Sequence, residues 1–188
     1  MHVERLAPHP IISPELDPTI GTNINGPCLV RAPEWFRPEL GRYYLYFAHH
    51  KGAFIRLATA DALTGPWRVY PRGALGLRNS RFPSRVSEIT PRSEFVRAQL
   101  EAGLEEPHIA SPDVHVDEAA REVRMYFHGL MPDGTQLTRV ALSRDGVNFE
   151  AREPLLGLPY FRVFRHQGWH YALGMPGIFF RSRDGLGN

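Results

Sequence analysis

Asp113 and His115 are the residues whose types and spacing best fit acid–base chemistry. They stand two positions apart in a run of β-forming residues, 113–117. Because alternate side chains of a strand point to the same side, we expect the carboxylate and the imidazole to lie together. Such a pair suits general acid–base catalysis, or half of a metal site. A structural alternative stays open, in which Asp113 caps a turn and His115 only packs against a neighbouring sheet.

A second polar group ends the aromatic run 42–49 and consists of two histidines and the only lysine of the chain, His49-His50-Lys51. Neighbouring residues of a strand face opposite ways, so at most one of the two histidines points into a shared site. That histidine can act as an acid or ligate a cation, and the Lys51 ammonium suits an anionic substrate. A solvated loop is the alternative interpretation of the same run.

His108 and His128, taken with His115, raise the question of a metal site. Zinc requires three or four ligands, and these histidines lie in separate segments without a compact motif. Cys28 is the only cysteine, which excludes a multi-cysteine zinc site and a disulfide within the chain. We therefore expect neither a metal nor a cofactor, and a cation held in an axial channel has no support in the sequence.

Short strands are the elements that must position these residues. Runs of β-branched and aromatic residues, separated by Gly, Pro, Asn and Asp, recur along the chain at 28–32, 42–49, 53–60, 113–117, 122–129, 136–143, 161–165 and 169–175. Only residues 92–106 have helical spacing, with Phe95, Leu100 and Leu104 on one face. The sequence predicts an all-β fold with one short helical insertion.

The strands belong to a repeat. Residues 27–67 and 112–149 share one order: a proline-led strand, an aromatic strand, an arginine-containing strand, and a fourth strand that ends in Trp67 or Phe149. A third copy begins at Pro159, and units of this size are typical of β-propeller blades. The prediction is a single partial propeller over 1–188, with blade 1 at about 25–71, the insertion at about 72–107, blade 2 at about 108–154 and partial blade 3 at about 155–188.

About two and a half blades cannot close a ring, because blades bury their faces by stacking around an axis. We therefore expect these 188 residues to be a fragment of a longer protein. An unclosed edge also favours self-association of the isolated chain.

The repeat resembles the five-bladed β-propeller glycoside hydrolases, the group of arabinanases and β-xylosidases. The segments that carry the resemblance are GPCLVRAPEW, YYLYFAHHKGAFIRLATADALTGPW, SPDVHVD, VRMYFHGL and TRVALSRDGVNF. The resemblance extends from about residue 23 to the end of the chain. It implies a propeller of the five-bladed glycosidase type and a carbohydrate substrate.

The acidic positions of this family are not preserved here. The family has a carboxylate before a proline at the start of the first inner strand, where this chain has Asn25-Gly26-Pro27. The second inner strand has Ser111-Pro112, and the third has Leu158-Pro159-Tyr160 in place of a glutamate before a proline. The family carboxylates therefore do not carry over residue by residue, and Asp113 is the best single carboxylate.

In a propeller, the starts of the inner strands and the ends of the second strands surround one mouth. The repeat places there the candidate catalytic residues Asp113, His50 and His115. It also places there the candidate substrate-binding residues Asn25, His49, Lys51, His108, Ser111, His128 and Arg162.

Three functions fit these residues: acid/base hydrolysis of a glycosidic bond, non-catalytic glycan binding, and a phosphorylase or lyase that holds an anionic group. The net charge of +2 gives no field for nucleic acid, so no such partner is expected. No run of about 18 apolar residues spans a membrane, and no signal segment is visible. We therefore expect a cytoplasmic protein whose partner is a carbohydrate.

Overall fold

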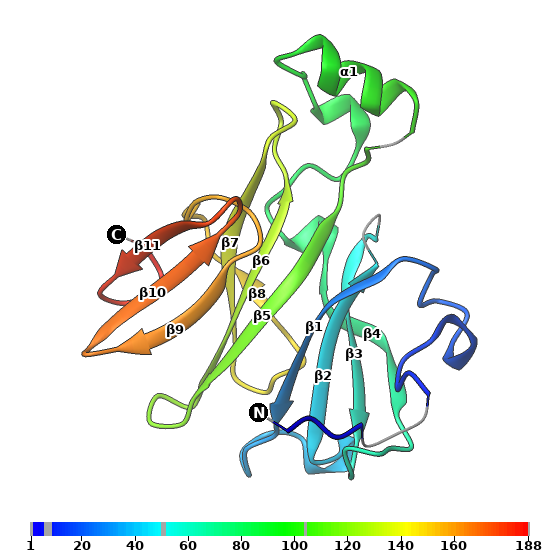
Figure 1. The fold of residues 1–188 in the computed structure, drawn as a ribbon, viewed down its shortest axis with the longest axis vertical. Coiled ribbons are helices and arrows are strands. Elements are labelled where there is room, and N and C mark those ends of the chain that lie inside the picture. The colour runs from blue at the N-terminus through cyan, green and yellow to red at the C-terminus, as the bar shows by residue number, and fades with distance from the viewer. Residues whose placement is uncertain (1, 6–8, 50–51, 104, 188) are drawn as a thin grey trace.

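The computed structural model describes residues 2–5, 9–49, 52–103 and 105–187, and within them the chain forms three antiparallel sheets (Figure 1). Each sheet is a meander in which strands that follow one another in sequence are paired. The first sheet contains β1 (Ile24–Arg31), β2 (Tyr43–His49), β3 (Phe54–Ala60) and β4 (Arg68–Gly76). The second contains β5 (Ile109–Asp117), β6 (Glu122–Leu130), β7 (Gln136–Ser143) and β8 (Glu150–Ala151). The third contains β9 (Arg162–His166), β10 (Trp169–Gly174) and β11 (Ile178–Ser182).

This arrangement confirms the all-β class and the expectation of a partial propeller. The last strands of the first two sheets differ from the expected ones, because β4 and β8 begin after Trp67 and Phe149 instead of ending there. Both rings are buried, so they anchor the turn from which the outer strand starts. β4 continues to Gly76, into the range in which the insertion was expected.

The main core lies between the first two sheets. Tyr44 and Tyr46 from β2 and Phe127 from β6 are fully buried there, as expected of blade aromatics that face a neighbouring blade. A smaller cluster between the second and third sheets contains Tyr126 and Phe161. Apolar burial on both sides of the second sheet thus joins the three sheets into one stack.

One hydrogen bond repeats between successive sheets. The Tyr46 hydroxyl on β2 donates to the Gly146 carbonyl of the second sheet at 2.6 Å, and the Tyr126 hydroxyl on β6 donates to the Gly185 carbonyl after β11 at 3.0 Å. Both glycines follow an aspartate in the turn that closes their sheet. The sequence repeat is therefore also a repeat of inter-sheet contacts.

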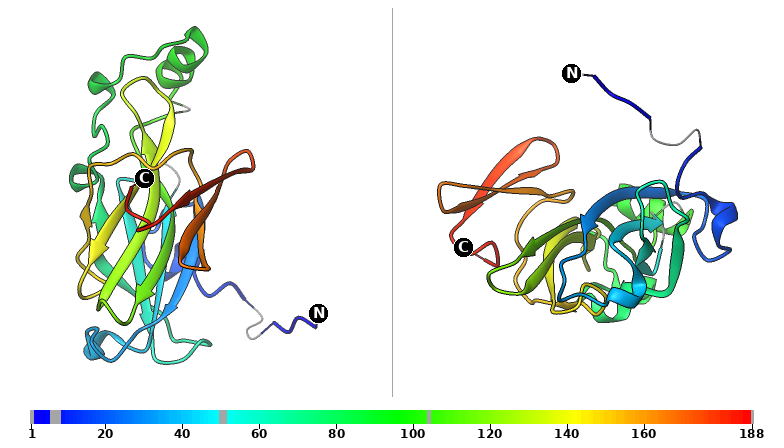
Figure 2. Two further views of the ribbon diagram at one scale, coloured as in Figure 1. Left: turned by 90° about the vertical axis from the view of Figure 1, so that its left-hand side faces the viewer. Right: turned by 90° about the horizontal axis from the view of Figure 1, so that it is seen from below.

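The two outer faces of the stack differ. Ile20, in the segment before β1, is fully buried against Phe47 and Trp67 on the outer face of the first sheet. The third sheet lies at the other end of the stack (Figure 2, right), and Phe164 and Phe179 of its strands are 48% and 64% exposed. The chain thus covers one end of the stack and leaves apolar side chains exposed at the other.

The helical insertion packs on one hairpin. Helix α1 (Glu94–Glu101) is capped by Ser93, whose side chain accepts the Val96 N–H, and it lies beside the β6–β7 hairpin (Figure 2, left). The backbone of Thr90 bonds to Pro132 in that hairpin. The helix is shorter than the expected 92–106, and Phe95 is 73% exposed, so the expected apolar face does not bury this ring. Leu104 lies outside the described residues.

Four short 3-10 helices complete the described secondary structure: Pro14–Leu16, Pro38–Leu40, Leu77–Asn79 and Val86–Glu88. In the part of the chain that the structure describes, no helix is long and apolar enough to cross a membrane.

Candidate functional site

Each sheet has a residue in the left-handed backbone region within two residues of the start of its first strand. These residues are Gly26 at φ 57°, Ser111 at φ 52° and Tyr160 at φ 63°. In β1 and β5 the residue stands within a break in the strand register, as expected of a bulge. The same backbone shape at all three starts identifies equivalent positions, so Cys28, Asp113 and Arg162 occupy one place in the repeat.

This equivalence corrects the sequence alignment of the third unit. An alignment that starts the third unit at Pro159, opposite Pro27 and Pro112, lies two residues too early. The reason is conformational: the position before the proline takes a positive φ, and in the third unit Tyr160 takes it. Phe161 therefore stands where the first two units have a proline.

The three strand starts lie together, with β5 between β1 and β9 (Figure 1). A methyl group at Gly26 would meet the Cα atom of Ser111 at 2.5 Å, so the first two starts are in direct contact. Arg162 closes the group from the third sheet, because its Nη1 donates to the Ser111 carbonyl at 3.5 Å. We call this meeting point of Gly26, Ser111 and Tyr160 the mouth.

Asp113 lies at the mouth with its side chain held by two groups. Its Oδ2 accepts the N–H of Val163 on β9 at 2.7 Å and lies 2.9 Å from Nε2 of His115. The residue is only 9% exposed. The structure thus brings Asp113 and His115 together, and it also makes Asp113 a link between the second and third sheets.

Cys28 makes the equivalent link one sheet earlier. Its Sγ accepts the N–H of Val114 on β5 at 3.1 Å, as Asp113 accepts the N–H of Val163. Burial raises the pKa of the Cys28 thiol, the negative charge of Asp113 raises it further, and the Arg162 guanidinium opposes this effect. Thiol, carboxylate and guanidinium are therefore close enough to act on one another.

His108 and His128 form a buried layer beneath the mouth. Nδ1 of His108 lies 2.7 Å from the Glu106 carbonyl and 3.2 Å from Oε1 of Glu105. The His128 ring lies 6.0 Å from the His108 ring and 4.3 Å from the Tyr160 ring, between centroids. Both histidines are almost fully buried, so they support the residues above them and do not present a free imidazole to solvent.

Asn25 and His49 lie at the first sheet's side of the mouth. The Asn25 Nδ2 donates weakly to the Asn23 carbonyl at 3.4 Å, and its buried Oδ1 has no partner in the described part of the chain. Nδ1 of His49 accepts the Asn23 N–H at 3.2 Å, which turns this ring toward the segment before β1. His50 and Lys51, expected at the same place, lie outside the described residues.

Glu105 and Tyr160 are the mouth residues that the sequence-based site set omitted. Tyr160 carried a signal, because it opens the third repeat, but the alignment on Pro159 hid its equivalence with Ser111. Glu105 carried none, since no periodicity predicts the path by which the insertion returns to β5. Within the described ranges, no group of three or more His, Cys, Asp or Glu side chains is placed to hold a metal ion.

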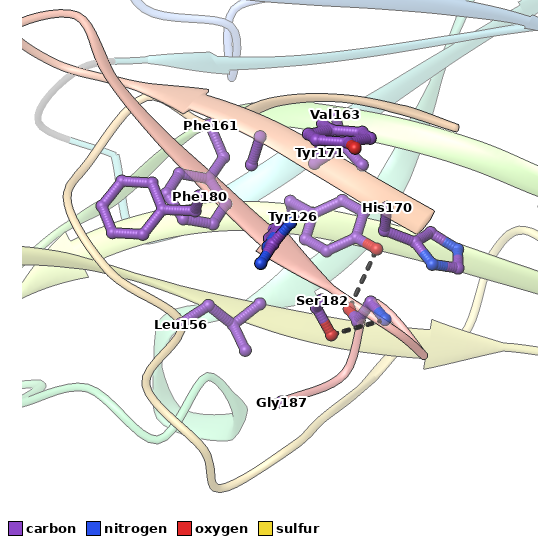
Figure 3. Close-up of a pocket in the computed structure, with 12 residues that line it drawn as sticks. Tyr126, Leu156, Phe161, Val163, His170, Tyr171, Phe180, Ser182 and Gly187 are labelled. Carbon is purple, nitrogen blue, oxygen red and sulfur yellow. Dashed lines mark hydrogen bonds between the residues drawn. The ribbon is translucent and has the colours of Figure 1, made fainter. Parts of the chain in front are cut away.

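The best-formed cavity lies away from the mouth. It has a volume of about 160 Å³ between the second and third sheets and is lined by Tyr126, Phe161 and Phe180, among others (Figure 3). Ligand pockets usually measure about 300–1,000 Å³. Because this small cavity contains none of the expected site residues, we interpret it as packing space between two sheets.

Comparison with known proteins finds a relative in sequence and several neighbours in structure. The chain is 35% identical over 176 residues to the uncharacterised protein R118 of Acanthamoeba polyphaga mimivirus, and the match covers 88% of this chain and 46% of that protein. No family model matches the sequence.

Among solved structures, a GH43 β-xylosidase/α-arabinofuranosidase from a compost microbial metagenome, in complex with xylotriose, superposes with a TM-score of 0.57 at 11% identity. That match covers 88% of this chain and 44% of the enzyme. The GH43_1 enzyme of Xanthomonas citri with xylotriose gives 0.57 at 13% identity, over 88% of this chain and 42% of the enzyme. An α-L-arabinofuranosidase of Clostridium thermocellum gives 0.52 at 19%, over 84% and 47%.

These likenesses confirm the predicted fold: the three sheets correspond to part of a five-bladed propeller of the glycoside hydrolase type. The chain spans about half the length of the proteins it matches. At such low identities, the likeness to the solved structures concerns the fold, and the function depends on the residues at the mouth.

Proposed function

We propose that the chain recognises an oligosaccharide of xylose or arabinose units at the mouth and contributes to hydrolysis of its glycosidic bonds. The observation that carries the proposal is that Asp113 and Arg162 occupy equivalent positions beside the starts of neighbouring inner strands of a glycosidase-type propeller. The Asp113 carboxylate accepts the Val163 N–H there, and the Arg162 guanidinium donates to the Ser111 carbonyl. Solved enzymes of this fold hold xylotriose. Sugar hydroxyls both donate and accept hydrogen bonds, so a carboxylate and a guanidinium at one mouth suit them.

The surroundings of Asp113 define its role in such a reaction. Its Oδ2 accepts the Val163 N–H and lies 2.9 Å from Nε2 of His115, so an imidazole and a carboxylate are in contact there. Hydrolysis generally uses one protonated and one ionised carboxyl group. Asp113 is therefore proposed as the ionised partner, as base or as a charge that tunes the acid.

Glycan binding without catalysis is the second candidate, and a specific observation favours it. Cys28 occupies the position of Asp113 in the first sheet and makes the same inter-sheet hydrogen bond, although it has no proposed catalytic role. Asp113 has a sufficient structural reason to be present, and a mouth of this kind can bind sugar without cleaving it.

Calorimetric titration with xylotriose, together with assays of xylose release, tests the proposal. Asp113→Asn keeps an oxygen for the Val163 N–H but removes the charge, and Asp117→Asn on the same strand is the matched control. We expect binding to the wild type and about tenfold weaker binding to Asp113→Asn, since a hydrogen bond to a charged group is stronger by about 1–1.5 kcal/mol. Absence of binding to xylotriose and to arabino-oligosaccharides would reject the function. Unchanged turnover in Asp113→Asn would exclude a catalytic role for Asp113, and binding without any release of xylose would support glycan binding alone.

We also propose that the chain self-associates through the exposed face of the third sheet, with a second copy as the partner. Phe164 and Tyr171 stack on this face with ring centroids 5.4 Å apart, and Arg181 pairs with Tyr171 in register. The covered outer face of the first sheet favours pairing of two third sheets.

Arginines on both partners of such a pair repel each other, so added salt strengthens the dimer. Sedimentation analysis should show a concentration-dependent dimer that Phe179→Glu abolishes. A wild-type monomer at every concentration and ionic strength would reject this pairing.

A further inference from the structure

Glu105 is a carboxylate that the helical insertion carries back toward the propeller. Its backbone N–H donates to the Gln99 carbonyl near the end of α1 at 3.2 Å, and β5 begins four residues later, at Ile109. The side chain is 25% exposed, so it is neither buried in the core nor free in solvent. The insertion therefore ends by placing an acidic group next to the second inner strand.

His108 fixes the position of this carboxylate. Nδ1 of His108 lies near two acceptors, the Glu106 carbonyl at 2.7 Å and Oε1 of Glu105 at 3.2 Å. A carbonyl cannot donate, so Nδ1 carries a hydrogen and donates to the Glu106 carbonyl, and Oε1 of Glu105 lies beside the same nitrogen. Because the His108 ring is buried, this contact holds the Glu105 oxygen close to the start of β5.

A chain of ring contacts connects Glu105 to the mouth. Oε1 of Glu105 lies 3.2 Å from His108, whose ring lies 6.0 Å from that of His128, and the His128 ring lies 4.3 Å from that of Tyr160. Tyr160 is the left-handed residue at the start of the third sheet. In agreement with this placement, burial raises the pKa of the Tyr160 phenol, and the negative charge of Glu105 raises it further. Glu105 thus lies beside the mouth, on the side of the third sheet.

Among the described strand residues, Asp113 is the one carboxylate that the sheets bring to the three strand starts, and its Oδ2 already has two partners. We propose that Glu105 is the second carboxylate of the carbohydrate site and contacts hydroxyl groups of the bound sugar directly. One of its oxygens is held by His108, and the exposed part of the group accepts from the ligand. This inference rests on the proposed function and assigns a sugar contact to the insertion, outside the blades.

The test compares xylotriose binding by the wild type, Glu105→Gln and Glu106→Gln. Glutamine at 105 keeps an oxygen beside the His108 Nδ1–H, so the local fold is retained while the charge is lost. Glu106 is an exposed neighbour whose contact with His108 uses the backbone, so Glu106→Gln removes the same charge one residue away. We expect about tenfold weaker binding for Glu105→Gln and no change for Glu106→Gln.

Equal affinity of Glu105→Gln and the wild type would overturn the inference, as would an equal loss in both variants, which would indicate a general charge effect. If Glu105→Gln does not fold, Glu105→Asp takes its place: it keeps the charge but withdraws the oxygen by one carbon–carbon bond. We expect weaker binding there too, and unchanged affinity overturns the inference. A wild type that binds no sugar overturns the proposed function, and this inference with it.

Discussion

Removal of the Asp113 side chain should weaken the junction between the second and third sheets. In Asp113→Ala, the Val163 N–H loses the Oδ2 acceptor at 2.7 Å, and His115 loses its partner at 2.9 Å. The bond to Val163 is charge-assisted and largely shielded from water, which gives it about 1.5–3 kcal/mol. The His115 side chain is 40% exposed, so its pair contributes less than about 1 kcal/mol.

The free energy of unfolding should therefore fall by about 2–3 kcal/mol, which lowers the Tm of a chain of this size by about 4–12 °C. Urea denaturation gives the first quantity. Hydrogen exchange of the Val163 amide gives a local one, because this amide should lose its protection while amides in β6 keep theirs. Cys28→Ala is the matched comparison: it removes a weaker sulfur acceptor at the equivalent position and should cost less. A loss below about 0.5 kcal/mol with normal protection at Val163 would refute the role of Asp113 as an inter-sheet link.

Three further outcomes follow from the contacts between and within the sheets. Tyr46→Phe should lower the free energy of unfolding by about 1–2 kcal/mol in urea titrations, because it leaves a buried carbonyl of the second sheet unpaired; no loss would contradict the repeated inter-sheet bond. Gly26→Ala should cost at least about 2 kcal/mol, since φ is positive and the new methyl group would meet Ser111 backbone, whereas Gly76→Ala, with open space around it, should be neutral. Burial lowers the pKa of His170, so the folded state favours the neutral ring. Protonation therefore favours the unfolded state, and the folding stability present above about pH 6.5 is lost as the pH falls through the folded-state pKa. His170→Gln should flatten the pH dependence of Tm in this window, and an unchanged profile would contradict the assignment.

Much of the fold was predictable from the sequence because the inner strands are rich in β-branched and aromatic residues. The expected run 136–143 coincides with β7. The equivalent arginines of the third strands stack on aromatic rings, Arg56 over Phe54 at 4.1 Å and Arg139 over Phe82 at 5.2 Å. β4 was missed because Pro71 and Gly73 interrupt its apolar pattern.

The site was less predictable than the fold. The adjacency of Asp113 and His115 follows from strand alternation, and the structure shows it. The link from Asp113 to Val163 depends on how two sheets pack, which no local pattern encodes. Glu105 follows the end of α1, in the segment that returns to β5, and no sequence pattern predicts the path of that segment, so its position at the mouth appears only in three dimensions.

The central claim, that the mouth recognises carbohydrate, is tested most directly by NMR titration of the labelled chain with xylotriose. The account predicts saturable shifts of backbone amides at 24–28, 105–113 and 160–162, where the three inner strands begin and the insertion returns. It predicts no shifts at Phe179 on the exposed face of the third sheet. Absence of shifts at the mouth, or shifts confined to cavity residues outside these ranges, such as Tyr126 and Phe180, would contradict it.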